Sequence, residues 1–136
     1  AVEARNDISP EGLRLLGVTV LTSLDGTEFP DVYRTMDLRS RVRALADAAC
    51  HCGLDGAVAS TQELSVLCRI TPREFLKVIP GIRAAGGITH DQARVGTPSA
   101  ALRAGATHLV VGRAITGAED PAGAARGILE EMSAAV

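Results

Sequence analysis

Four short apolar runs, separated by longer amphipathic stretches, dominate the pattern of this chain. The runs lie at positions 15–21, 56–60, 75–80 and 108–112 and consist largely of Val, Ile, Leu, Ala and Gly. Short apolar runs of this kind, flanked by turn residues, are typical of parallel strands that are buried on both faces. The pattern therefore predicts four buried parallel strands.

The stretches between these runs predict helices. A helix over 36–52, ended by Gly53, is indicated by apolar residues at helical spacing, namely Leu38, Val42, Leu45, Ala46 and Ala49. A brief helix is expected over 62–69, another from the cap Thr97 and Pro98 up to Gly105, and a last one that Asp120 and Pro121 open and that runs to about Ser133. Residues 1–5 are interpreted as the tail of a further helix that ends at Asn6 and Asp7.

Strands that alternate with helices favour an α/β fold of parallel βα repeats, about four units long. A complete (β/α)₈ barrel typically needs roughly 250 residues, whereas this chain has 136. We therefore expect residues 1–136 to form a single partial domain, about half of such a barrel, with the upstream half absent.

Composition narrows the possible partners and location. The net charge of −2 argues against a nucleic-acid partner, and no apolar run is long enough to suggest a membrane span. Three cysteines without framework spacing fit a reducing cytoplasm. The group Cys50, His51 and Cys52 is expected to be structural, because a zinc site needs about four ligands and no second pair of ligands is spaced to complete one.

Two predicted strands are followed by glycine and arginine. The third run continues into Pro80, Gly81 and Arg83, and the fourth run ends in Gly112 and Arg113. Glycine lets backbone N–H groups approach an anion, and arginine supplies forked, charged donors. The loops after the last two strands of a (β/α)₈ barrel often hold a phosphate. We therefore predict a phosphate-binding corner here, with Gly86 and Gly87 in a closing loop, although each arginine by itself would more simply be a surface ion-pair residue.

Six short motifs resemble, in order and approximate spacing, the orotidine 5′-phosphate decarboxylase family. They are Leu-Thr-Ser-Leu-Asp at 21–25, Gly-Leu-Asp-Gly at 53–56, Pro-Gly-Ile-Arg at 80–83, Asp-Gln-Ala-Arg at 91–94, Thr-Pro at 97–98 and Val-Gly-Arg at 111–113. The resemblance covers nearly the whole chain but only the C-terminal half of the family's TIM (β/α)₈ barrel. It implies a homodimeric enzyme that converts orotidine monophosphate to UMP, in pyrimidine synthesis, without cofactor or metal.

The resemblance also implies roles for individual residues. It implies that the pyrimidine side of the substrate is bound by Thr22, Ser23 and Pro80. It also implies that the 5′-phosphate is bound by Arg83, Gln92, Gly112 and Arg113. Without the resemblance, Gln92 would be an ordinary loop amide and Thr22 an ordinary hydroxyl at a strand end.

The family's catalytic Lys/Asp array has no counterpart in this sequence. The only lysine, Lys77, is expected at the solvated start of the third strand, away from the phosphate corner. The chain alone is therefore expected to be inactive. Two alternatives remain open: a non-catalytic phosphate- or nucleotide-binding half-barrel that pairs with itself or with another half, and a related sugar-phosphate barrel enzyme.

Overall fold

The computed structural model describes residues 1–8, 12–21, 37–83 and 96–135. The predicted site residues Thr22, Ser23 and Gln92 lie outside these ranges, as does the closing loop predicted around Gly86 and Gly87.

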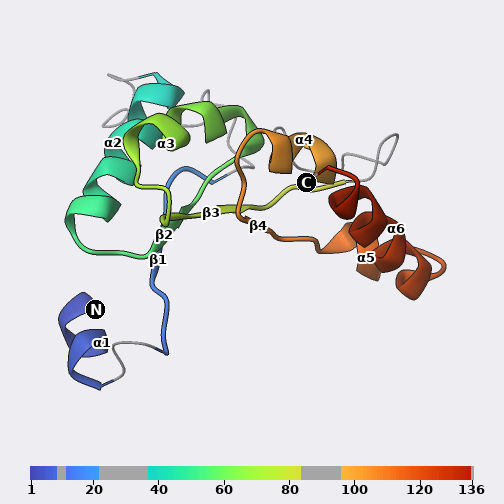
Figure 1. Ribbon diagram of the computed structural model, residues 1–136, viewed down its shortest axis with the longest axis horizontal. Helices are drawn as coiled ribbons and strands as arrows, with labels where there is room; N and C mark the ends of the chain where they lie inside the picture. Colours follow the sequence, from blue (N-terminus) through green and yellow to red (C-terminus); the bar gives the residue numbers. More distant parts are fainter. Residues whose placement is uncertain (9–11, 22–36, 84–95, 136) are drawn as a thin grey trace.

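A four-stranded parallel sheet forms the centre of the fold (Figure 1). Its strands are β1 (Leu16–Val18), β2 (Gly56–Val58), β3 (Leu76–Ile79) and β4 (His108–Leu109), and they lie side by side in chain order. The parallel arrangement of four strands is confirmed. Each strand is shorter than the apolar run that predicted it.

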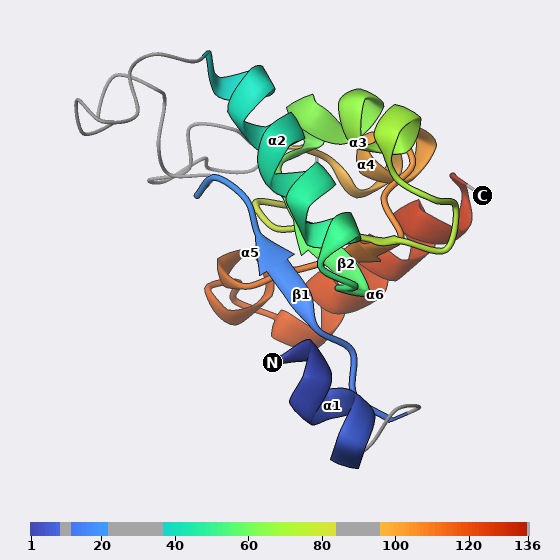
Figure 2. The same ribbon diagram turned by 90° about the vertical axis from the view of Figure 1, so that its left-hand side faces the viewer.

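One helix precedes the sheet, and helices follow each of its strands. They are α1 (Val2–Ile8), α2 (Leu38–His51), α3 (Leu64–Ile70) with the preceding 3₁₀ turn η2 (Thr61–Glu63), α4 (Pro98–Arg103), α5 (Arg113–Thr116) and α6 (Pro121–Ser133). Helices α2, α3 and α4 lie along the same face, and α5 and α6 follow β4 at the far end of the sheet (Figure 1). Helix α1 lies beyond the amino end of β1 (Figure 2).

Helix starts agree with the caps read from the sequence. The Thr97 side chain accepts a hydrogen bond from the Ala100 N–H, and Pro98 occupies the first turn of α4. The Asp120 carboxylate accepts from the Gly123 N–H at the start of α6. One predicted end was wrong, because α1 continues through Asn6 and Asp7 to Ile8; the short helix α5 had not been predicted.

The hydrophobic core lies between the sheet and these helices. Val42, Ala46 and Ala49 form the buried stripe of α2, and Leu64 and Leu67 that of α3. Their spacing of three to four residues is that of one helix face, which explains why the periodicity located α2 correctly. Most core side chains are Ala, Val, Leu or Ile, so helices approach the sheet closely.

The opposite face of the sheet carries exposed apolar side chains. Gly17 faces α2, because a Cβ there would lie 3.2 Å from the Ala49 Cβ, so its neighbours Leu16 and Val18 point the other way. Val18 is 60% exposed, and Leu16 and Val110 are exposed as well. Among the described residues, no helix packs on this face (Figures 1 and 2). It is the face that a closed barrel would turn inward.

Lys77 is not solvated, contrary to the prediction. It is the second residue of β3, pairs with Ala57 of β2, and is only 4% exposed. Its side chain lies on the helix-covered face, and Nζ donates a hydrogen bond of 2.9 Å to the Phe75 carbonyl. The prediction failed because the position of a residue along a strand does not reveal which face its side chain takes. Register decides that.

None of the helices in the described ranges combines the length and the apolar content needed to cross a membrane.

Candidate functional site

The carboxyl ends of β3 and β4 bring two arginines to the same edge of the sheet. Ile79 pairs with Leu109, and the Val110 N–H donates to the Ile79 carbonyl at 2.8 Å. Arg83 follows Ile79 by the same number of residues as Arg113 follows Leu109, namely four. In a parallel sheet, carboxyl ends of neighbouring strands meet at one edge, which is where open α/β sheets and barrels bind ligands.

The segment after β3 is tightly held. Gly81 has a φ of 76°, a left-handed conformation that glycine adopts without strain. Ile82 then forms an isolated parallel bridge with Gly96, and the Arg83 N–H donates to the Gly96 carbonyl at 3.0 Å. The Arg83 side chain is 7% exposed, and its Nη1 donates to the Ile82 carbonyl at 2.7 Å. Arg83 is thus a buried arginine at the strand end, whereas Pro80 is half-buried.

The segment after β4 is more open. Arg113 is the first residue of α5 rather than part of a strand end, and the Ile115 N–H donates to the Gly112 carbonyl at 2.8 Å. A Cβ placed on Gly112 would meet nothing within 4 Å among the residues that the structure describes, so these residues leave space beside this backbone. Gly112 and Arg113 are both exposed. This geometry leaves room for a ligand group to approach the Gly112 backbone.

A buried polar pair at the end of β2 was not foreseen as part of the site. Ser60 and Glu63 are almost fully buried, and both the hydroxyl and the N–H of Ser60 donate to the Glu63 carboxylate. The Ser60 Oγ in turn accepts from the Gln62 N–H at 3.2 Å. This reciprocal arrangement is a capping box, and its signal, Ser followed three positions later by Glu, can be read in the sequence. It fixes the backbone where β2 reaches the carboxyl edge of the sheet.

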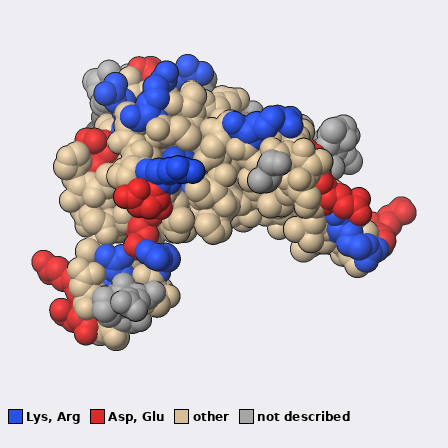
Figure 3. All heavy atoms as spheres, viewed as in Figure 1, with Lys and Arg blue, Asp and Glu red and all other residues tan. Residues whose placement is uncertain are grey.

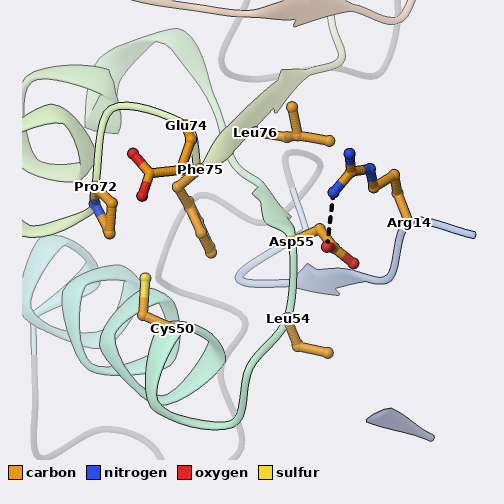
Figure 4. Close-up of a pocket in the computed structure, with 8 residues that line it drawn as sticks. All are labelled: Arg14, Cys50, Leu54, Asp55, Pro72, Glu74, Phe75 and Leu76. Carbon is orange, nitrogen blue, oxygen red and sulfur yellow. Dashed lines mark hydrogen bonds and ion pairs between the residues drawn. The ribbon is translucent and has the colours of Figure 1, made fainter. Parts of the chain in front are cut away.

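A hollow of about 350 Å³ lies at the opposite, amino edge of the sheet (Figure 4). Asp55 forms part of its wall and accepts hydrogen bonds from the Leu15 N–H at 2.7 Å and from the Arg14 Nη1 at 3.2 Å. It also pairs with Arg5 of α1. The Leu15 N–H, with the two guanidinium groups, lowers the pKa of the Asp55 carboxyl below its ordinary value. These contacts bind α1 and β1 to β2.

Basic side chains elsewhere lie on helix surfaces. Figure 3 shows Lys and Arg side chains over α2 and α3, and acidic side chains around α1. Arg39 and Arg43 of α2 and Arg69 of α3 surround a wide, shallow hollow between the two helices.

The Cys50, His51 and Cys52 group shows the contacts of a helix end. The His51 Nδ1 lies 2.8 Å from the Asp47 carbonyl, Cys52 caps α2, and burial raises the pKa of the half-buried Cys50 thiol. Within the ranges that the structure describes, no three His, Cys, Asp or Glu side chains lie close enough together to hold a metal ion.

Comparison with known proteins identifies relatives along nearly the entire chain. Residues 2–128 match the family described as orotidine 5′-phosphate decarboxylase / HUMPS. The orotidine 5′-phosphate decarboxylase of Methylobacterium sp. (strain 4-46) is 44% identical over 135 residues, which are 99% of this chain and 57% of that protein. The decarboxylase of Syntrophotalea carbinolica is 44% identical over 98% of this chain and 53% of that protein.

Solved structures agree with the sequence relatives. The crystal structure of orotidine 5′-phosphate decarboxylase from Lactobacillus acidophilus superposes with a TM-score of 0.70 and 36% identity, over 88% of this chain and 49% of that one. The chain thus spans about half the length of the relatives it matches, and its four βα units are half of a TIM barrel. By sequence and by fold, the chain belongs to the orotidine 5′-phosphate decarboxylase / HUMPS family.

Proposed function

We propose that this chain supplies the phosphate-binding and part of the pyrimidine-binding residues of an orotidine 5′-phosphate decarboxylase. The reaction converts orotidine monophosphate to UMP and carbon dioxide. Around the phosphate we place Arg83, Gln92, Gly112 and Arg113. On the pyrimidine side we place Thr22, Ser23 and Pro80.

The observation that carries this proposal is the pairing of β3 with β4. It brings Arg83 and Arg113 to one edge, each four residues beyond a paired position. Arg113 and the open backbone at Gly112 suit a phosphate dianion, because charge-assisted hydrogen bonds to it are strong and the site is accessible. The buried Arg83 contributes positive charge to the same edge, and its Nη1 bond to Ile82 fixes its orientation.

The catalytic step needs a group that this chain does not place at that edge. As the C6–CO₂ bond breaks, its electron pair stays on the pyrimidine carbon, which then takes up a proton; an ammonium can stabilise the charge and supply that proton. The only ammonium side chain, Lys77, is buried on the helix-covered face near the amino end of β3. We infer that the chain alone does not catalyse decarboxylation and that the ammonium comes from a complementary half-barrel.

A direct test joins this chain to the part of the Methylobacterium relative that it does not match. The joined protein should decarboxylate orotidine monophosphate, and the 136-residue chain should not, as measured by the change in pyrimidine absorbance. The same fusion with Arg113→Ala should have a lower kcat/KM, because phosphate binding remote from the reacting ring stabilises the transition state. Turnover by the chain alone would refute the proposed need for a partner half. A well-folded fusion without activity would refute the proposed function.

The alternative, a phosphate-binding half-barrel without catalysis, is favoured by the same two arginines and by the position of Lys77. Binding measurements with UMP and uridine distinguish phosphate binding without catalysis from decarboxylation. If the well-folded fusion binds UMP more tightly than uridine but shows no turnover, the binding function stands and the catalytic one falls. Homodimer formation and the cytoplasmic location remain predictions.

A further inference from the structure

Gly96 joins the end of β3 to the start of α4 through its backbone. Its N–H donates to the Gly81 carbonyl at 3.2 Å, and its carbonyl accepts from the Arg83 N–H at 3.0 Å. These two bonds make the bridge between Ile82 and Gly96, one residue before the cap of α4. The position of the Arg83 backbone therefore depends on where Gly96 sits.

Thr61 fills the space that a side chain at position 96 would need. A Cβ on Gly96 would overlap the Thr61 Cγ2 and would lie 3.0 Å from its Oγ1 and 3.1 Å from its Cβ. The overlap is severe only with the Thr61 Cγ2, whereas the Thr61 Cβ at 3.1 Å is a tight contact that a small shift relieves. The backbone at Gly96 is not in the left-handed region, in contrast to Gly81. Glycine is therefore required at position 96 by Thr61 and not by the local backbone conformation.

Thr61 is poorly able to move away. It is the first residue of η2, directly after Ser60, and the Ser60–Glu63 capping box fixes the backbone on either side of it. A β-branched side chain has little rotational freedom. The contact between Thr61 and Gly96 thus connects the end of β2 to the bridge that holds Arg83 at the end of β3.

We propose that Gly96 and Thr61 are positioning residues for the phosphate site: their contact sets the place of the Arg83 backbone, and through it the strength of anion binding. This inference rests on the proposed function, since the contact can affect anion binding only if the phosphate is bound at the ends of β3 and β4. Neither residue needs to touch the phosphate.

Amide hydrogen exchange of the 136-residue chain tests whether the contact between Thr61 and Gly96 positions the Arg83 backbone. In Gly96→Ala, the Arg83 N–H should exchange about tenfold faster or more, because overpacking pushes the bridge apart. The Thr19 N–H, which donates to the Val58 carbonyl between β1 and β2, should keep its rate. Adding Thr61→Ala to Gly96→Ala removes the Cγ2 and Oγ1 contacts and should restore the Arg83 rate to within about threefold of wild type.

Titration of the fusion described above with UMP and with uridine tests whether this contact affects anion binding. Gly96→Ala should weaken UMP binding by about tenfold and leave uridine binding unchanged, and the double variant should recover UMP binding. Gly127→Ala is the matched control, because a Cβ there meets nothing within 4 Å among the described residues. This control should alter the binding of neither UMP nor uridine.

The outcomes separate this inference from the proposed function. If the unmutated fusion binds UMP and uridine equally, the proposed function fails, and the claim about anion binding fails with it. If the unmutated fusion prefers UMP but Gly96→Ala retains that preference, only the positioning role is overturned. Loss of UMP binding that Thr61→Ala does not reverse also overturns it, because the threonine contact is then not the cause.

Discussion

Replacing Asp55 by Asn tests whether one carboxylate fastens the amino edge of the sheet. Asp55 lies directly before β2 and accepts hydrogen bonds from the Leu15 N–H and from Arg14, and it pairs with Arg5 of α1. Asparagine keeps the size of the side chain but removes its charge. The substitution should therefore weaken these contacts without opening a cavity.

The magnitude follows from the exposure of each partner. A hydrogen bond to a charged group contributes roughly 1.5–3 kcal/mol when it is sheltered, as are those from the Leu15 N–H and Arg5. Arg14 is 68% exposed, and such a pair contributes about 0–1 kcal/mol. Asparagine still accepts one hydrogen bond, which recovers part of the loss. We expect a net loss of about 2 kcal/mol in the free energy of unfolding, or roughly 30-fold in the equilibrium constant.

The pH dependence identifies the charge as the cause. Because the folded state lowers the pKa of Asp55, its contribution is complete above the unfolded pKa of about 4 and disappears as the pH falls through the folded pKa. Urea unfolding at fixed protein concentration should separate wild type from Asp55→Asn at pH 7, with the difference shrinking below pH 4. The control is Asp47→Asn, since Asp47 is exposed. An Asp55→Asn difference that is the same at pH 3 and pH 7 would refute this reasoning.

Two further predictions concern the thiols and the uncovered sheet face. Because burial raises the pKa of the Cys50 thiol, iodoacetamide at pH 8 should alkylate Cys50 more slowly than the exposed Cys52 and Cys68, as peptide mass spectrometry can measure. Equal rates would contradict the shielding of Cys50. Because Leu16 and Val18 of the edge strand β1 are exposed, the isolated chain should self-associate in sedimentation experiments. A compact monomer over a wide concentration range would contradict this prediction.

The sequence predicted the order and type of the main elements but not their exact extent. The start of α6 and the span of α2 followed from cap residues and from a helical repeat, which are local signals. The run at 15–21 is longer than β1, because strand length is set by pairing, and β2 offers partners only to Leu16, Gly17 and Val18. Pairing is non-local, so a single run cannot reveal it.

The candidate site was predictable where short motifs sit at strand ends. Arg83 and Arg113 could be placed at one edge because parallel strands share their carboxyl edge. The burial of Lys77 and the contact of Thr61 with Gly96 depend on register and on packing between segments far apart in the chain. Neither leaves a pattern within one stretch of sequence, so neither could be predicted.

The most direct test of the central claim, a phosphate site at the ends of β3 and β4, is calorimetric titration of UMP and uridine against the fusion and its Arg113→Ala variant. Loss of charged hydrogen bonds worth roughly 1.5–3 kcal/mol should weaken UMP binding by about ten- to a hundredfold. Uridine, which has no phosphate, should bind both proteins equally. If Arg113→Ala weakened uridine as much as UMP, the arginine would be structural and the phosphate site would not be where these strands end.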